Sequence, residues 1–273
     1  MPAVLQISDT HFGTEQAPVV AALLDLARAL GPEVVVFSGD VTQRARAAQF
    51  AAAAEFVKQL GAPRVLTIPG NHDIPLFNVL ARVRAPYAGF VRAFGPELEP
   101  QYSSESLLVA CINTTRPRRH KDGEISNAQI ERVAALARQA RPKQLRIAVV
   151  HQPVHVIRTH DLENLLHGYE AAVRTWAGAG IDIVMGGHIH LPYVRALNER
   201  ITGLPRRIWA VQAGTAVSSR VRYEAPNSVN VLRYEPEARD ELGQRRCLVE
   251  QWNYVASAQA FRCKETTELH LER

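Results

Sequence analysis

The stretch Val34-Val35-Val36-Phe37-Ser38-Gly39-Asp40 decides how the rest of the chain is interpreted. Its apolar run has the length and the β-branched character of one buried strand. The glycine then permits a close backbone approach, and an aspartate follows directly at the end of the strand. A carboxylate in this position could offer one oxygen to each of two cations, which is what a site with paired metal ions requires.

Four other predicted strands also end in residue types that bind metals. They run into Asp9-Thr10-His11, Gly70-Asn71-His72-Asp73, His151-Gln152-Pro153 and Gly187-His188-Ile189-His190. Each block alone has an ordinary alternative, because an aspartate after a strand is often a helix cap, a Gly-Asn segment a turn, and a single histidine structural. Open α/β sheets place their sites at the carboxyl ends of the strands, so we expect the five blocks to converge in one crevice.

Seven of these side chains form a mixed set of nitrogen and oxygen donors that suits first-row transition metals. The set is richer than one tetrahedral site needs, but it fits two neighbouring five- or six-coordinate ions. Its members are Asp9, His11, Asp40, Asn71, His151, His188 and His190. The sequence therefore predicts two divalent or trivalent transition-metal ions, with Mn, Fe and Zn as the candidates.

Short apolar runs alternate with amphipathic stretches through the first two thirds of the chain, as in layered α/β structures. Strands are predicted at residues 3–8, 34–38, 64–68, 106–113, 145–150 and 181–185, and helices at 17–30, 46–60, 76–94, 127–141 and 162–179. After residue 187 the pattern becomes mostly β, with strands at 207–212, 228–234 and 247–254. A second sheet is plausible there.

The composition is that of a globular protein, with 47% apolar and 22% charged residues among 273. We predict a single domain over residues 1–255 and a loose C-terminal tail over 256–273. The net charge of +5 hints at an acidic partner, but the basic residues are scattered along the chain. The one compact basic cluster begins at Arg116 and ends at Lys121, and it is either a solvated loop or a contact for an anionic substrate.

The cysteines and the N-terminal residues are typical of a cytoplasmic protein. Cys111, Cys247 and Cys263 form no Cys-x-x-Cys pair, so neither a disulfide framework nor a thiolate zinc site is predicted. The N-terminal residues lack the basic start, apolar core and cleavage site of a signal peptide. No apolar stretch is long enough to span a bilayer, so we expect no membrane partner.

In this order, the five blocks closely resemble the signature of the calcineurin-like metallophosphoesterase superfamily, over about residues 5–191. The resemblance implies an α/β fold, a four-layer α-β-β-α sandwich of two mixed β-sheets with helices outside. It also implies two metal sites, Asp9, His11, Asp40 and His190 forming one and Asp40, Asn71, His151 and His188 the other, with Asp40 as the bridge. Asn71 and His72 would bind the substrate, and His72 would protonate the leaving oxygen or stabilise developing charge.

Two positions distinguish branches of the superfamily. Gln43 and Ala45 stand where the protein Ser/Thr phosphatases carry an aspartate and a glycine, which argues against that subgroup. The first block, Asp-Thr-His, and the last block, Gly-His-Ile-His-Leu-Pro, are more similar to the bacterial cyclic-nucleotide phosphodiesterase (class III) branch, whose members are often dimers. The resemblance implies that a metal-bridging hydroxide hydrolyses a small phosphodiester such as a cyclic nucleotide.

Two alternatives use the same fold. A nuclease acting on DNA or RNA would account for the net positive charge of the chain, although no basic or aromatic groove is evident in the sequence. A non-catalytic interaction scaffold would be expected to have lost metal ligands, yet every expected ligand is present.

Several outer residues have two interpretations. Asp73 either orients a neighbour or begins the next helix, and the second is favoured. His155 either approaches the substrate or is a loop histidine, again with the second favoured. His120 and His160 are interpreted as surface residues, and the arginines at 220 and 222 either close the site or belong to a turn.

Overall fold

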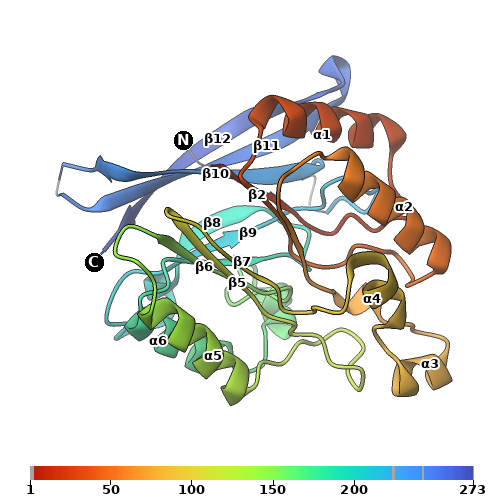
Figure 1. Ribbon diagram of the computed structural model, residues 1–273, viewed down its shortest axis with the longest axis horizontal. Coiled ribbons are helices and arrows are strands. Elements are labelled where there is room, and N and C mark those ends of the chain that lie inside the picture. The colour runs from red at the N-terminus through yellow and green to blue at the C-terminus, as the bar shows by residue number, and fades with distance from the viewer. Residues whose placement is uncertain (1–2, 223–224, 242, 273) are drawn as a thin grey trace.

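Two six-stranded mixed sheets stack face to face in the computed structural model, which describes residues 3–222, 225–241 and 243–272 (Figure 1). The first sheet has the order β12 (Ala260–Leu271), β11 (Arg245–Val255), β10 (Ser228–Arg239), β1 (Ala3–Ile7), β2 (Val34–Phe37) and β3 (Val65–Thr67). The second has the order β4 (Gln101–Ser103), β5 (Leu107–Cys111), β6 (Leu145–Val149), β7 (Ile183–Gly186), β9 (Trp209–Gln212) and β8 (Tyr193–Ala196).

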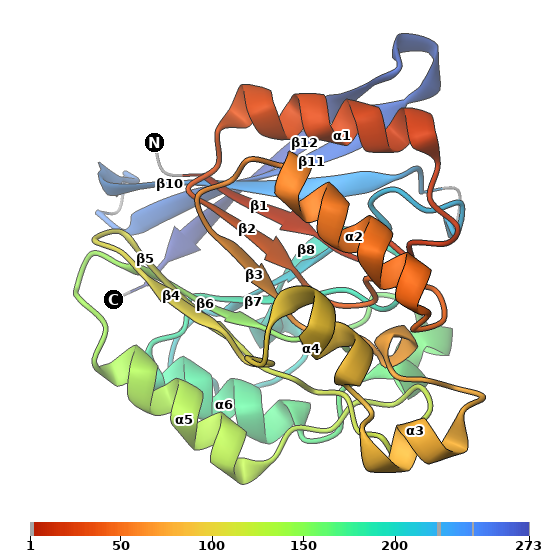
Figure 2. The same cartoon turned by 45° about the vertical axis from the view of Figure 1, so that its right-hand side comes forward.

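Helices cover the outer faces of both sheets, which confirms the predicted four-layer α-β-β-α sandwich (Figure 2). The helices α1 (Ala17–Leu30) and α2 (Ala47–Gln59) lie on the first sheet, and α5 (Asn127–Arg138) and α6 (Tyr169–Ala179) on the second. The short helices α3 (Val79–Arg84) and α4 (Ala88–Phe94) follow β3. No helix among the described residues is long and apolar enough to cross a membrane.

The alternation of side chains along a strand explains the layers. In β2, Val35 and Phe37 pack under α1 and α2, whereas Val34 and Val36 face the second sheet. Both faces of the strand are therefore apolar, as expected for a strand that is covered on both sides. β1, β2 and β3 are mutually parallel, and so are β5, β6, β7 and β9, so that the carboxyl ends within each set share one edge.

Two of the predicted helices are wrong in extent. The predicted helix at 76–94 is two short helices, because Pro86 between them lacks the N–H that a continuous helix needs. The predicted helix at 162–179 begins only at Tyr169. It follows a 3-10 segment, η2 (Thr159–Asn164), and Gly168, whose φ of +88° places it outside helical geometry.

The C-terminal third also differs from the prediction. The strands after residue 187 do not form a separate sheet, because β8 and β9 join the second sheet and β10 to β12 join β1 in the first. The predicted loose tail at 256–273 is wrong over most of its length, since β12 pairs with β11 from Ala260 to Leu271. This edge strand buries only Phe261, Leu269 and Leu271, so its polar composition hid it in the sequence.

Candidate metal centre

The predicted ligands lie at the carboxyl ends of β1, β2, β6 and β7 and just after β3, and five of the seven have a backbone conformation that residues other than glycine rarely adopt. Asp9, His11, Asp40, His188 and His190 have φ angles of 52°, 42°, 51°, 73° and 55°. Left-handed backbone is uncommon for residues other than glycine, and it persists only where the surroundings enforce it. Hydrogen bonds from the N–H of Asp9 to the Gly39 carbonyl, 3.1 Å, and from the N–H of His11 to the Asp40 carbonyl, 3.0 Å, hold two of these residues in place. Strain of this kind is concentrated at functional sites.

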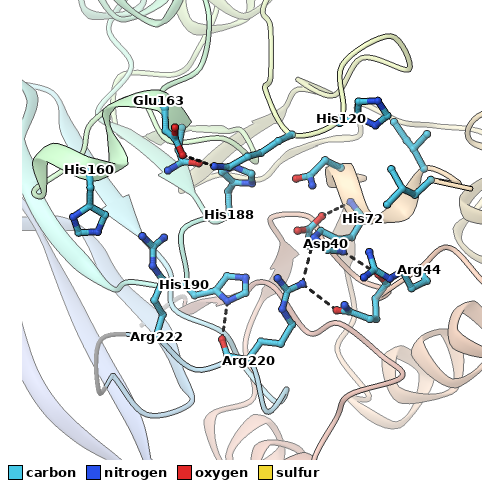
Figure 3. A pocket seen from close by; sticks show the side chains of 16 residues that line it. Asp40, Arg44, His72, His120, His160, Glu163, His188, His190, Arg220 and Arg222 are labelled. Carbon is cyan, nitrogen blue, oxygen red and sulfur yellow. Dashed lines mark hydrogen bonds and ion pairs between the residues drawn. The ribbon is translucent and has the colours of Figure 1, made fainter.

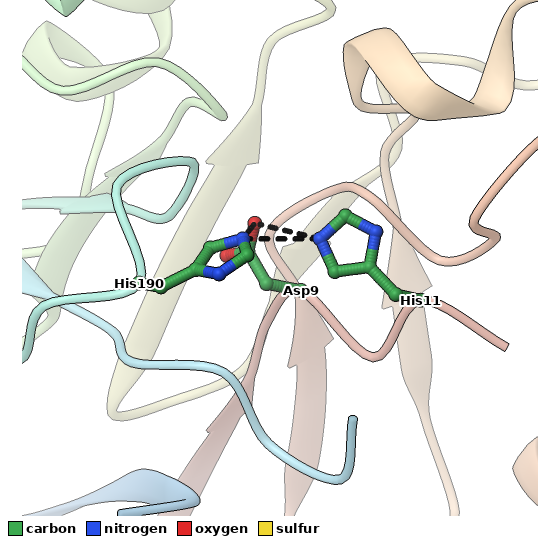
Figure 4. Close-up of side chains that lie close together, drawn as sticks. All are labelled: Asp9, His11 and His190. Carbon is green, nitrogen blue, oxygen red and sulfur yellow. Dashed lines mark hydrogen bonds and ion pairs between the residues drawn. The ribbon is translucent and has the colours of Figure 1, made fainter. Parts of the chain in front are cut away.

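The first group consists of Asp9, His11 and His190 (Figure 4). The Nε2 atom of His190 lies 3.2 Å from Oδ1 of Asp9 and 3.0 Å from Nε2 of His11. Three donor atoms from the ends of β1 and β7 therefore converge on one point, and such a group could hold a metal ion.

The second group consists of Asp40, His151 and His188, with Asn71 beside them. The Nε2 atom of His151 lies 3.4 Å from Oδ1 of Asp40 and 3.3 Å from Oδ1 of Asn71. The other Asp40 oxygen, Oδ2, lies 3.7 Å from Nε2 of His11 in the first group. The Asp40 carboxylate thus has one oxygen toward each group, the arrangement that a bridging ligand would need.

Backbone carbonyls fix the orientation of two of these histidines. The Nδ1 atom of His151 lies 2.8 Å from the Ser38 carbonyl, and Nδ1 of His190 lies 2.7 Å from the Arg220 carbonyl. A carbonyl only accepts hydrogen bonds, so each ring donates through Nδ1. This leaves Nε2 directed toward the carboxylates, where it could bind a cation.

His188 provides the clearest test of whether the site fits a metal ion. Neither of its two ring nitrogens has a hydrogen-bond partner among the described residues, although both atoms are buried. A buried polar atom without a partner costs free energy, and native structures contain few of them. A metal ion that binds one ring nitrogen of His188 removes part of this cost, so the residues present fit the predicted cofactor.

Burial and neighbouring charges shift the pKa values of the histidines in the cluster in opposite directions. Burial lowers the pKa of His11 and of His188 to about 3, so both rings are neutral at physiological pH. Burial also opposes the charge on His151, but the carboxylates of Asp40 and Asp9 outweigh it and raise the pKa of His151 to about 9. In the protein without metal, a proton on His151 therefore supplies positive charge between the carboxylates, and metal binding would displace it.

The same balance operates on the acidic residues. Burial alone would raise the pKa of Asp9. The opposite effect of His190 and His151 is larger and lowers this pKa to about 2. Burial likewise raises the pKa of Asp40, and His151 and His72 more than compensate and hold it well below its usual value. Both carboxylates are ionised at neutral pH, as metal binding requires.

Asp73 has a different role from the one favoured from the sequence. It does not only begin a helical turn, because its carboxylate accepts hydrogen bonds from the N–H of Val41, 3.0 Å, the N–H of Thr42, 2.7 Å, and the N–H of Gly70, 2.9 Å. Asp73 therefore joins the loop that carries Asp40 to the loop that carries Asn71. Burial, followed by the charge of Asp40, raises the pKa of Asp73 to about 6.

Gly187 allows the two sheets to approach each other at the site. A Cβ atom at this position would lie 2.1 Å from Oγ of Ser8 and 2.6 Å from Oδ2 of Asp9, which is closer than atoms can pack. The N–H of the next residue, His188, donates to Oδ2 of Asp9 at 3.0 Å. A side chain at position 187 would push the β7 loop away from the β1 loop.

A pocket of about 930 Å³ opens above both groups (Figure 3). His72 forms part of its wall: the His72 N–H donates to Oδ1 of Asp40 at 2.8 Å, and Nδ1 lies 2.9 Å from the Gln43 carbonyl. The Nε2 atom of His72 lies 3.3 Å from Nη1 of Arg220, which also donates to Oε1 of Gln43 at 3.0 Å. Arg220 is therefore part of the site.

The basic cluster and two of the histidines also bear on this pocket. Within the cluster, Arg118 and Arg119 pair with Glu124, whereas Lys121 lines the pocket. His120 and His160 are exposed, as predicted, and they line the pocket as well.

His155 lies elsewhere in the structure. Its ring packs against Tyr193 with ring centroids 6.0 Å apart, and it is absent from the pocket lining. Local sequence could not decide between the two interpretations of these outer residues, because their partners are distant in the chain.

Comparisons with known proteins bear on the family and on the fold. A model of the family described as calcineurin-like phosphoesterase matches residues 2–192. A Synechococcus protein named "Probable cyclic nucleotide phosphodiesterase" is 24% identical over 204 residues, covering 71% of this chain and 75% of the relative.

Two solved structures share the fold. A dimetal phosphatase from Danio rerio aligns over 99% of both chains with a TM-score of 0.66 and 12% identity. A purple acid phosphatase from yellow lupin aligns over 98% of this chain and 53% of its own, with a TM-score of 0.71 and 11% identity. At these identities the two structures bear on the fold alone.

Proposed function

Because the chain belongs to the calcineurin-like phosphoesterase family, we propose that it is a metal-dependent hydrolase that cleaves a phosphodiester. The observation that carries the proposal is the position of Asp40, whose two carboxylate oxygens face two different groups of nitrogen and oxygen donors. The name of the Synechococcus relative supports a small phosphodiester, such as a cyclic nucleotide, as the substrate.

Two transition-metal ions, Mn, Fe or Zn, are the cofactors that suit this donor set. Asp9, His11, Asp40 and His190 would hold one ion, and Asp40, Asn71, His151 and His188 the other. When bound, such a pair of cations lowers the pKa of a water molecule and neutralises negative charge on a phosphate.

His72 is positioned for a role at the leaving group. Its Nδ1 donates to the Gln43 carbonyl, so Nε2 is the nitrogen that faces the pocket. A protonated Nε2 could pass its proton to the departing ester oxygen, and the neutral ring could then take up a new proton from water. Asn71 lies next to His72 at the pocket wall and would bind a phosphate oxygen through its amide NH₂.

Arg220 contributes to the site through two separate parts of the residue. Its backbone carbonyl accepts from His190, and its guanidinium lies among Gln43, His72 and the pocket. Replacing Arg220 with glutamine keeps the backbone carbonyl and removes only the cation. We expect kcat/KM for a phosphodiester to fall about 100-fold, the usual cost of losing one donor to developing negative charge, while the metal content stays at the wild-type level.

Arg222 provides the matched comparison, because it also lines the pocket but its guanidinium is paired with Asp161 at 2.6 Å. Arg222→Gln should lose less activity than Arg220→Gln. An Arg220→Gln enzyme with wild-type kcat/KM would show that this arginine does not act on the phosphate.

Substrate preference tests the proposed function directly. With Mn²⁺ present, the protein is expected to hydrolyse bis(p-nitrophenyl) phosphate faster than p-nitrophenyl phosphate. A panel of cyclic nucleotides, single-stranded DNA and diesters from lipid head groups then separates a cyclic-nucleotide phosphodiesterase from a nuclease. A preference for the monoester would reject the diesterase proposal, and no turnover with any substrate at saturating Mn²⁺ would favour the scaffold alternative.

We also propose a cytoplasmic location. Cys111 and Cys247 are buried free thiols and Cys263 is an exposed one. Unpaired cysteines are typical of a reducing compartment.

A further inference from the structure

The first turn after η1 (Asn71–Asp73) and the helix α3 expose an unusual number of large apolar side chains. Phe77, Val79, Leu80 and Val83 are 81%, 68%, 60% and 75% exposed. Val79, Leu80 and Val83 share one face of α3, because residues three and four apart lie next to each other on a helix. Figure 2 shows α3 at the edge of the molecule, away from both sheets. We call these four residues the α3 surface.

The α3 surface adjoins the mouth of the metal pocket. The residue before Phe77, Leu76, lines the pocket, and so does Arg44, whose guanidinium lies 5.8 Å from the centre of the Phe77 ring. On the other side, Arg82 of α3 donates hydrogen bonds of 2.6 Å to the carbonyls of Pro117 and Arg119. These bonds attach α3 to the loop that carries His120 and Lys121 of the pocket wall.

Positive charge surrounds the α3 surface. Residues 44–46, 74–84 and 116–124 contain eight arginines and lysines but only two acidic residues, Asp122 and Glu124. Glu124 pairs with Arg118 and Arg119, and Glu163 pairs with Lys121, so these segments keep an excess of cations. A symmetric contact between two copies would bring like charges together, which costs free energy. The occupant that fits this face is therefore both apolar and negatively charged.

We propose that the α3 surface docks the protein onto an anionic lipid surface, with the mouth of the metal pocket facing the lipid head groups. A short, protruding apolar face can enter the interfacial layer of a bilayer without a preformed groove, while neighbouring arginines attract anionic head groups. Such binding is peripheral and reversible, and it revises the expectation that the protein has no membrane partner. The proposal concerns attachment to lipid and does not depend on which phosphodiester is cleaved.

Sedimentation with vesicles tests the proposal. The wild-type protein is expected to bind vesicles of phosphatidylcholine with phosphatidylglycerol, to bind pure phosphatidylcholine more weakly, and to dissociate as salt is raised. Leu80→Gln with Val83→Gln keeps good helix formers in α3 but removes two apolar side chains. The partition coefficient onto anionic vesicles should fall at least about tenfold, since burying one leucine is worth more than the roughly 1.4 kcal/mol that a factor of ten represents.

Val255→Gln is the matched control, because Val255 is an exposed apolar residue at the end of β11, outside the α3 surface. This variant should bind vesicles as the wild type does. The melting temperature of Leu80→Gln with Val83→Gln should equal that of the wild type, which shows that the variant is folded, and turnover of bis(p-nitrophenyl) phosphate, a soluble diester, should be unchanged. Because vesicle binding requires no turnover, failure of the proposed catalytic function would leave this measurement valid.

Two outcomes would overturn the proposal. One is equal vesicle binding by the wild type and the double variant. The other is the absence of wild-type binding to anionic vesicles at low salt. If the protein then forms a dimer that requires Leu80 and Val83, a second copy of the chain is the occupant of the α3 surface.

Discussion

Replacing Asp40 with asparagine is expected to lower metal-dependent turnover of bis(p-nitrophenyl) phosphate by more than about 100-fold. Mutating a residue that merely orients a metal ligand typically lowers activity about 10- to 100-fold. Mutating a residue whose carboxylate faces both donor groups should therefore lower activity more. Asparagine keeps the size of the side chain but replaces one anionic oxygen with an NH₂ group. That group would face either Nε2 of His11, now 3.7 Å from the carboxylate, or Nε2 of His151, now 3.4 Å away.

Steady-state kinetics with Mn²⁺ measures this effect. Asp25→Asn is the control, because Asp25 is exposed and its only described ion pair is with Arg28 on the surface of α1. This variant should retain wild-type activity. An Asp40→Asn protein with near-normal turnover would remove the basis for a shared carboxylate and for the mechanism built on it.

Replacing Asp182 with asparagine is expected to have the largest effect on stability. Asp182 is fully buried, and its Oδ1 accepts from Arg206 at 2.7 Å and from Arg245 at 2.9 Å. Arg245 belongs to the first sheet, whereas Asp182 precedes β7 of the second, so this cluster ties the two sheets together. Removing the carboxylate leaves two buried cations without their counter-charge, which costs about 3–5 kcal/mol of unfolding free energy.

Thermal and urea unfolding measure this loss, which corresponds to a decrease in melting temperature on the order of 10 °C. Asp25→Asn again serves as the control, because an exposed ion pair contributes little. Asp182 stands at the amino end of β7, opposite the metal groups, so the folded variant should keep its metal content. An unchanged unfolding free energy would show that the cluster does not join the sheets.

The parts of the site that sequence could predict are those encoded locally. Asp40 is the third residue after Phe37, where β2 ends, and His151 is the second residue after Val149, where β6 ends, so each ligand is marked by the strand before it. The shared edge of parallel strands then brings these residues together. The uninterrupted apolar run of β2 likewise predicted a fully buried strand.

The parts that sequence could not predict depend on contacts across long separations. Asp73 reaches the N–H groups of Val41 and Thr42, 32 and 31 residues away, and no local pattern distinguishes this from a helix cap. Arg220 lies 148 residues from His72, its neighbour in the site. The strand β12 depends on pairing with β11 rather than on its own apolar content.

The position of Mn²⁺ in crystals of the protein, located by anomalous diffraction, tests the central claim most directly. The expected result is two peaks, one beside Asp9, His11 and His190 and one beside Asn71, His151 and His188, with Asp40 contacting both. A single peak, or peaks away from these residues at saturating Mn²⁺, would contradict a dinuclear centre in this protein.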